Sequence, residues 1–310
     1  MTAAAAPGHL APRRSARRRL ALAVEPWLYT VPSVFLIALI MLVPLALGLS
    51  FAFRDLVLLD PDSGGFVGLD NFRQLAGDDA FWGALRNTVT WTAASVALQF
   101  GFGLVLALLL DVPFRGRGLV QALVFLPWAV PSFLSGLNWA WLFNPVVGPL
   151  PHWFVSLGLM RTPDNILSSP DHAIWGPIAA NVWWGIPFFA ITLLAALQSI
   201  PDDLYEAAAM DGAGAVMRFR AITLPFLAPT IAITVMLRTV WIANFADLIV
   251  VMTRGGPADS TQILASYIFT LAFQRLDFGY ASAVAAVLLA LLLLYAAALV
   301  ALRQTLLRRA

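Results

Sequence analysis

Six long apolar stretches dominate the sequence and limit what the chain can fold into. Crossing about 30 Å of hydrocarbon takes about 20 apolar residues in a helix, and each stretch reaches that length. A helix also satisfies its backbone hydrogen bonds internally, as lipid requires. We therefore expect an all-α integral membrane protein with six transmembrane helices, at residues 27–53, 85–110, 119–143, 174–197, 224–252 and 280–302.

The polar residues exclude several classes of function. All 19 basic residues are Arg and none is Lys, so the chain lacks the Lys of the phosphate-binding loop that ATP-hydrolysing domains use. The Arg side chains form short clusters rather than a basic stripe, which argues against nucleic-acid binding. No Cys is present, and His9, His152 and His172 are too scattered to hold a metal. We expect neither an enzyme nor a bound cofactor.

The distribution of Arg predicts the orientation in the membrane. If the N-terminus is inside, the two tails and the inner connections hold twelve Arg and the outer connections hold six. The positive-inside rule then places both termini in the cytoplasm. The expected domains are a cytoplasmic Arg-rich tail (1–26), a first transmembrane helix with an outer loop (27–84), a five-helix transmembrane domain (85–302) and a cytoplasmic C-terminal tail (303–310). Segments 54–84, 144–172 and 253–278 are expected to be extracytoplasmic loops.

The connection between the fourth and fifth stretches carries the most informative pattern. Pro201 suits a first helical position, and Asp202 and Asp203 suit the positive end of a helix dipole. An Ala-rich run then sustains a helix until Gly212 permits a sharp turn. The residues alone fit two interpretations equally well. One is an amphipathic connection lying on the inner leaflet, and the other is a helix that docks on a partner.

The complete pattern resembles the signature loop of bacterial ABC-importer permeases. Glu206-Ala207-Ala208, Gly212 and Ile222-x-Leu224-Pro225 reproduce the EAA, G and I-x-LP elements of that loop at its spacing. Segments at 68–72, 87–88, 126–132, 184–187 and 255–257 are similar to the carbohydrate-uptake class, specifically the maltose-permease first-subunit type. The resemblance covers the chain from about residue 66 to the C-terminus.

This resemblance implies the type I ABC importer permease fold and a function. The chain would be a permease subunit of an ATP-driven, binding-protein-dependent importer that moves a sugar across the cytoplasmic (inner) membrane. Its implied partners are a second homologous permease subunit in a heterodimer, an ATP-binding subunit dimer and an extracytoplasmic solute-binding protein. The signature loop would dock on the ATPase as a coupling helix, through Glu206, Ala207, Ala208, Asp211, Gly212 and Ala213.

The fifth stretch has a face suited to a solute. Four of its residues fall at i, i+3, i+4 and i+7, which is one side of a helix. The resemblance assigns these and three residues of the fourth stretch to the solute path: Trp184, Gly185, Phe188, Arg238, Trp241, Ile242 and Phe245. Aromatic rings suit the apolar faces of a sugar, and Arg can donate to hydroxyls. Ordinary helix packing is the competing interpretation of the aromatic residues.

Several alternatives and details accompany this interpretation. An ion-coupled secondary transporter usually carries acidic relays and repeated halves, which are absent here, whereas an ABC permease for another solute such as glycerol phosphate stays open. The chain also departs from the maltose permease of enteric bacteria, with six predicted spans rather than eight and a short first outer loop.

Pro127 and Pro131 remove backbone donors inside the third stretch and predict a kink. Arg238 and Asp247 are not expected to pair.

Overall fold

The computed structural model describes Trp27 and residues 29–307. The predicted tail at 1–26 and the last three residues of the predicted C-terminal tail lie outside this part of the chain. Within it the regular structure is helical, with two isolated bridges, between Arg54 and Phe66 and between Val57 and Asp277. The chain comprises two compact units, Met1–Ser50 and Phe51–Ala310.

The first unit carries one long apolar helix. This helix runs over Tyr29–Phe51 and includes a π-helical segment, η1 (Ala38–Leu42), followed by α2 (Val43–Phe51). Its 23 residues are enough to cross a bilayer, and none of its most apolar stretch is buried. Lipid is the solvent that such a surface needs, and the structure has a helix where the sequence predicts the first span.

The second unit is built from helices of very different lengths. The longest are α4 (Asp79–Asp111), α8 (Trp175–Leu197), α11 (Leu224–Ala243) and α14 (Phe278–Leu307). The others are α3 (Asp70–Ala76), α5 (Arg117–Ala129), α6 (Ser132–Leu142), α7 (Pro149–Ser156), η2 (Ile166–Ser168), α9 (Asp202–Met210), α10 (Ala215–Arg218), η3 (Phe219–Thr223), α12 (Asp247–Met252) and α13 (Leu264–Phe273). In the described residues of both units, five helices are long and apolar enough to span a membrane, or six if α5 and α6 form one bent span.

The core of the second unit lies between α4 and α8, which pack together more extensively than any other pair of helices. Trp91 of α4 and Phe189 and Leu193 of α8 are completely buried there. The next helix to join them is α11, which packs against both. This three-helix centre supports the residues predicted to line the solute path.

A second core cluster ties the start of α4 to α13 and α14. The Asp78 carboxylate caps α4 by accepting from the Ala80 amide at 2.9 Å, and it accepts from the Tyr267 hydroxyl at 2.7 Å and from the Tyr280 hydroxyl at 2.5 Å. Burial alone would raise the pKa of Asp78, but these hydrogen bonds lower it below its usual value. Burial and the Asp78 carboxylate raise the pKa of Tyr267 to about 12.

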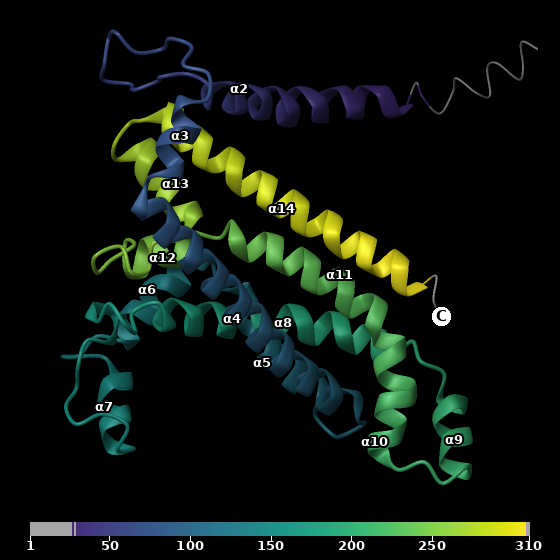
Figure 1. Cartoon of the computed structure of the whole chain (residues 1–310). Helices are drawn as coiled ribbons and strands as arrows, with labels where there is room; N and C mark the ends of the chain where they lie inside the picture. Colours follow the sequence, from purple (N-terminus) through teal and green to yellow (C-terminus); the bar gives the residue numbers. More distant parts are fainter. Residues whose placement is uncertain (1–26, 28, 308–310) are drawn as a thin grey trace, which may run out of the picture. The chain divides into compact units, whose positions relative to one another are not determined.

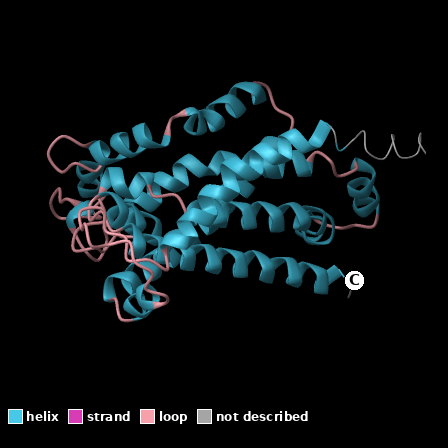
Figure 2. Ribbon diagram, turned by 90° about the horizontal axis from the view of Figure 1, so that it is seen from above, coloured by secondary structure: helices cyan, strands magenta, loops and turns pink. Residues whose placement is uncertain are grey.

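The segments that connect the long helices of the second unit lie at its two opposite ends. In Figures 1 and 2, α9 and α10 lie at one end, and α14 runs toward that end. The helices α3, α6, α7, α12 and α13, with the long loops, lie at the other. The three segments predicted as outer loops therefore share an end, away from the predicted inner loop. They are more structured than expected, because they contain α3, α7 and α13.

The predicted third span (119–143) is not one helix. The helices α5 and α6 meet at an angle of 94°. The break falls at Val130, whose extended backbone has ψ 125°, and at Pro131. Proline has no amide hydrogen and disfavours helical geometry in the residue before it. The predicted kink is therefore a sharp corner rather than a bend.

Two other spans differ from the sequence-based expectation in their boundaries. The fifth span (224–252) starts earlier, because α10, η3 and α11 run on from Ala215, and α11 ends at Ala243 before the short α12. The Asn244 side chain donates to the Val240 carbonyl at 2.9 Å, which caps α11 at this point. The sixth span runs on as α14 to Leu307, so the predicted C-terminal tail begins as helix.

Candidate functional sites

The predicted coupling loop folds as a helix, a tight turn and a second helix. Pro201 precedes α9 rather than starting it, and Asp202 and Asp203 occupy the first turn. Gly212 has φ +79°, a left-handed conformation that glycine adopts without strain. The Ala213 amide bonds back to the Ala208 carbonyl at 2.9 Å, which closes the C-terminal turn of α9.

The α9 helix projects from the second unit with none of its residues buried. It is fastened by a hydrogen bond of 2.9 Å between the Tyr205 and Thr223 hydroxyl groups. Met210 at its end is 89% exposed, and the Glu206 side chain has no hydrogen-bond partner in the described part of the chain. Exposed apolar groups beside an unpaired carboxylate form a surface suited to contact with another protein.

The predicted solute-path residues meet in a cluster of four aromatic rings, which we call the ring face: Trp184, Phe188, Trp241 and Phe245. The Trp184 ring stacks on Phe245, with centroids 5.4 Å apart and planes at 14°. Trp241 meets Trp184 and Phe188 edge-on, at 6.3 Å and 6.5 Å. Trp241 is 44% exposed, so the ring face reaches the surface of the second unit. Two helices and the segment after α11 thus contribute to one surface.

Arg238 lies beneath the ring face and is 1% exposed. Its guanidinium carbon is 5.1 Å from the ring centre of Trp241, 5.4 Å from that of Trp184 and 5.5 Å from that of Phe188. Its Nε donates to Gln99 Oε1 of α4 at 2.7 Å. Contacts of this kind stabilise a cation that has lost its water.

Gly185 makes room for this arrangement. A Cβ atom at this position would lie 2.3 Å from Arg238 Nη2 and 2.3 Å from the Gln99 side chain. Any larger residue would therefore displace the buried pair. Gly185 therefore lies against Arg238 and Gln99 inside the bundle, and its predicted place on the solute path stays a prediction.

Two other predicted residues are positioned differently from what the helical periodicity indicates. Ile242 is 1% exposed and belongs to the core, and its carbonyl accepts from Trp91 Nε1 at 3.0 Å. Phe245 lies beyond the end of α11, so it reaches the ring face through the turn after the helix rather than by i+7 spacing. Asp247 is exposed and accepts from the Ser132 hydroxyl at 2.6 Å, separate from Arg238 as expected.

Sequence reasoning missed Gln99 and the carbonyl of Val130. Gln99 is completely buried, and its Nε2 donates to the Asn181 carbonyl at 2.9 Å. The available signal was an uncharged polar residue in the middle of an apolar stretch. The Val130 carbonyl accepts from Trp184 Nε1 at 3.0 Å, and no sequence pattern indicates that contact.

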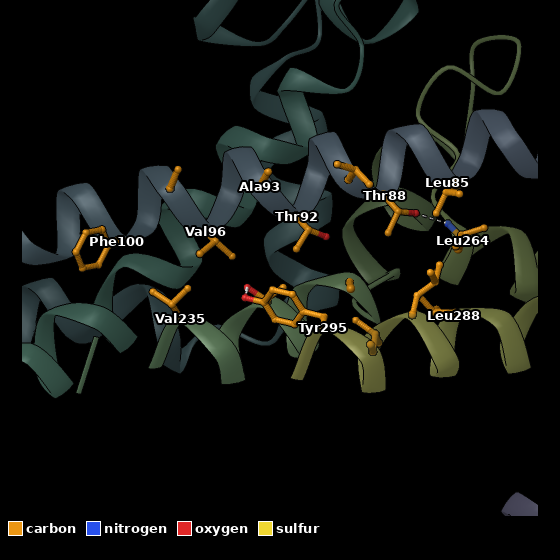
Figure 3. Close-up of a pocket in the computed structure, with 16 residues that line it drawn as sticks. Leu85, Thr88, Thr92, Ala93, Val96, Phe100, Val235, Leu264, Leu288 and Tyr295 are labelled. Atoms are coloured by element: carbon orange, nitrogen blue, oxygen red, sulfur yellow. Dashed lines mark hydrogen bonds between the residues drawn. The ribbon is translucent and has the colours of Figure 1, made fainter. Parts of the chain in front are cut away.

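A separate cavity of about 500 Å³ lies between α4, α11, α13 and α14. Figure 3 shows its lining, with Val96 of α4, Val235 of α11 and Leu288 and Tyr295 of α14 around the space. The Tyr295 hydroxyl donates to Thr239 Oγ1 at 3.1 Å, and most of the remaining lining is aliphatic. The ring face contributes nothing to this cavity. In the described part of the chain no cluster of acidic residues and His could hold a metal ion.

Comparison with known proteins gives consistent matches. Residues 99–308 match the family model described as binding-protein-dependent transport system inner membrane component. The trehalose/maltose transport system permease protein MalF of Thermococcus litoralis is 39% identical over 219 residues, covering 71% of this chain and 73% of that protein. The sulfoquinovosyl glycerol transport system permease protein SmoG of Agrobacterium fabrum is 36% identical over 266 residues, covering 85% of each.

A solved structure extends the match to the whole fold. It belongs to a bacterial ABC transporter involved in the import of the acidic polysaccharide alginate. The TM-score is 0.78 at 26% identity, over 93% of this chain and 99% of that one. The segment matched by the family model contains both the α9 loop and the ring face.

Proposed function

Because the chain belongs to the family of binding-protein-dependent transport system inner membrane components, we propose that it forms half of a carbohydrate pathway. It is a multi-pass permease subunit of an ABC importer in the inner membrane, and such subunits lack ATPase activity. Carbohydrate as the cargo is supported by the relatives, which are named for trehalose/maltose, sulfoquinovosyl glycerol and alginate. A permease of the same type for another solute, such as glycerol phosphate, is the alternative.

The α9 loop is proposed to couple this subunit to the ATPase. The observation that carries this role is the isolation of α9 at one end of the unit, with no residue buried and an unpaired Glu206. The loop leads directly into η3 and α11. The Tyr205–Thr223 bond links α9 to the last residue of η3, directly before α11 begins. A push on α9 would therefore move α11, which carries Arg238 and Trp241, as a rigid body.

The proposed partners are a solute-binding protein, a second permease subunit and an ATP-binding subunit dimer. A solute-binding protein belongs to transporters of this family, and a related alginate transporter has been solved with its periplasmic protein. We place a second homologous permease subunit against the ring face, so that the two subunits form a heterodimer around the path. An ATP-binding subunit dimer would occupy the side that carries α9.

The proposed orientation puts both termini and α9 in the cytoplasm. It is supported by the Arg distribution and by the placement of α9 opposite the longer loops. The proposed domains keep the boundaries given above: an Arg-rich tail (1–26), a first helix and outer loop (27–84), the transporter domain (85–302) and a short C-terminal tail (303–310).

Cysteine labelling tests the orientation directly, because the natural chain contains no Cys. Ala209→Cys lies on exposed α9, and Asp164→Cys lies on an exposed residue at the opposite end. A membrane-impermeant maleimide should label Asp164→Cys in intact cells and Ala209→Cys only after permeabilisation. Labelling of Ala209→Cys from outside would end the coupling proposal.

Transport and assembly test the two sites separately. Glu206→Lys should reduce co-purification of the ATPase while leaving membrane insertion unchanged, and Asp203→Lys provides a control in the same exposed helix. Arg238→Ala and Trp241→Ala should lower sugar uptake without affecting assembly. Trp153→Ala, at an exposed ring of α7, should leave uptake unchanged. Normal uptake by both ring-face variants would remove the solute path from this surface.

A further inference from the structure

Arg238 carries a buried positive charge that nothing in the described residues neutralises. It is the one charged side chain that is fully buried in that part of the chain. The single ion pair found there joins Arg73 to Asp70 on the surface. Both terminal nitrogens of Arg238 also lack a hydrogen-bond partner there. An isolated charge inside a membrane protein is costly and marks a site where a compensating group is expected.

Gln99 holds the guanidinium without cancelling its charge. Its Nε2 donates to the Asn181 carbonyl at 2.9 Å, which leaves Oε1 to accept from Arg238 Nε at 2.7 Å. Glu at this position could also accept the hydrogen bond, but its carboxylate would neutralise Arg238. The amide therefore fixes the orientation of Arg238 and preserves its full positive charge.

The ring face lies between this charge and the surface of the second unit. The rings of Trp184, Phe188 and Trp241 contact the guanidinium within 5.1–5.5 Å, but they carry no net negative charge. Trp241 is partly exposed, so a solute resting on its ring would lie one ring away from the cation. Charges interact over such distances when the intervening medium has a low dielectric constant.

We propose that the Gln99–Arg238 pair makes the ring face prefer a carbohydrate carrying a carboxylate or another anionic group over its neutral counterpart. This inference rests on the proposed function, since it requires the ring face to lie on the solute path. The aromatic rings would pack against the apolar side of the sugar, while Arg238 attracts its anionic group. Gln99 acts as a positioning residue, because it touches Arg238 and not the solute.

Binding of glucuronate and glucose tests the proposal, because the two sugars differ only in an oxidised C6. Equilibrium dialysis with labelled sugars would use the complete membrane complex, with both permease subunits and the ATPase, in nanodiscs. Glucuronate should bind roughly tenfold more tightly than glucose. The ratio of the two affinities, glucuronate over glucose, should fall to about one in Gln99→Glu and in Arg238→Gln. Gln198→Glu is the matched control, since it makes the same change at an exposed residue about 20 Å along α8 from Gly185.

The ratio of glucuronate affinity to glucose affinity does not depend on the fraction of protein that is correctly folded, since both sugars are measured on one preparation. Equal binding of the two sugars, no saturable binding of either, or a preference that survives in Arg238→Gln would overturn the inference. If Arg238→Gln fails to assemble, Gln99→Glu alone decides the outcome. Co-purification of the ATPase and uptake by the unmodified importer test the proposed function separately, so the two can fail independently.

Discussion

The indole nitrogen of Trp184 in α8 donates a hydrogen bond of 3.0 Å to the carbonyl oxygen of Val130. Val130 directly follows α5 and precedes Pro131, so its carbonyl lies at the corner between α5 and α6. A backbone group released from a helix inside a membrane protein needs such a partner. The same Trp184 ring stacks on Phe245, and the hydrogen bond therefore ties the ring face to the corner.

Trp184→Phe should keep a ring in place but lose this hydrogen bond. Leaving the carbonyl of Val130 without its donor should cost about 1–3 kcal/mol of stability. The thermal unfolding midpoint of the purified complex measures this loss. Trp183→Phe is the control, because the Trp183 indole donates no hydrogen bond in the described part of the chain. Equal midpoints for the two variants would show that the corner does not depend on Trp184.

Gly185→Ala should disrupt the buried pair of Gln99 and Arg238. Its Cβ would lie 2.3 Å from both side chains, and overpacking of this kind typically costs about 1–3 kcal/mol. We expect lower uptake and a lower unfolding midpoint. Gly101→Ala in α4 is the control, because no atom lies within 4 Å of its Cβ position. Wild-type behaviour of Gly185→Ala would mean that the pair can shift without consequence.

Gly212→Val should damage the α9 loop without affecting membrane insertion. Gly212 has φ +79°, and a β-branched residue is strongly disfavoured there. Co-purification of the ATPase should fall, because the turn that ends α9 is displaced. Gly214→Val is a matched control, since Gly214 has φ −69° and open space around its Cβ position. If both variants retain the ATPase equally, the shape of this turn does not matter for docking.

Asp78→Asn should loosen the joint between α4, α13 and α14. The hydrogen bonds of Asp78 hold its pKa below the usual value despite burial. A lowered pKa means that the carboxylate contributes stability above its unfolded pKa of about 3.9, and that this contribution is lost as the pH falls through the lower, folded value. The variant should therefore be less stable at neutral pH, and the difference should shrink in strong acid.

The pH series of unfolding midpoints needs a control for the loss of one negative charge. Asp79→Asn serves this purpose, because Asp79 is the exposed neighbour of Asp78 and forms no ion pair in the described residues. We expect its midpoints to follow the wild type at every pH. A difference between Asp78→Asn and wild type that does not shrink in acid would show that the ionised carboxylate is not the stabilising group.

Much of this protein follows from local sequence. The first, second, fourth and sixth apolar stretches appear as helices near their predicted positions, because length and hydropathy decide whether a segment can cross a bilayer. The membership in the ABC permease family, inferred from Glu206, Gly212 and Pro225 and their spacing, is also confirmed. The role of the individual loop residues remains a prediction.

The solute path shows where local pattern stops being sufficient. Helical spacing correctly grouped Arg238 with Trp241. It also put Ile242 on the same face, although this residue is buried in the core. It extended the helix to Phe245, although Asn244 ends α11 first. Periodicity describes a continuous helix and carries no information on which side a neighbouring helix will cover.

The sequence by itself determined the solvent of this protein, its helical class and its family, since these depend on hydropathy, length and spacing within single segments. Only the tertiary structure decided the partners of its buried polar groups. Gln99 meets Arg238 across 139 positions of chain, and Trp184 meets Val130 across 54. Such pairs form because backbone and side-chain polar groups cannot stay unpaired inside lipid. Which groups meet depends on how the helices pack, which no single segment encodes.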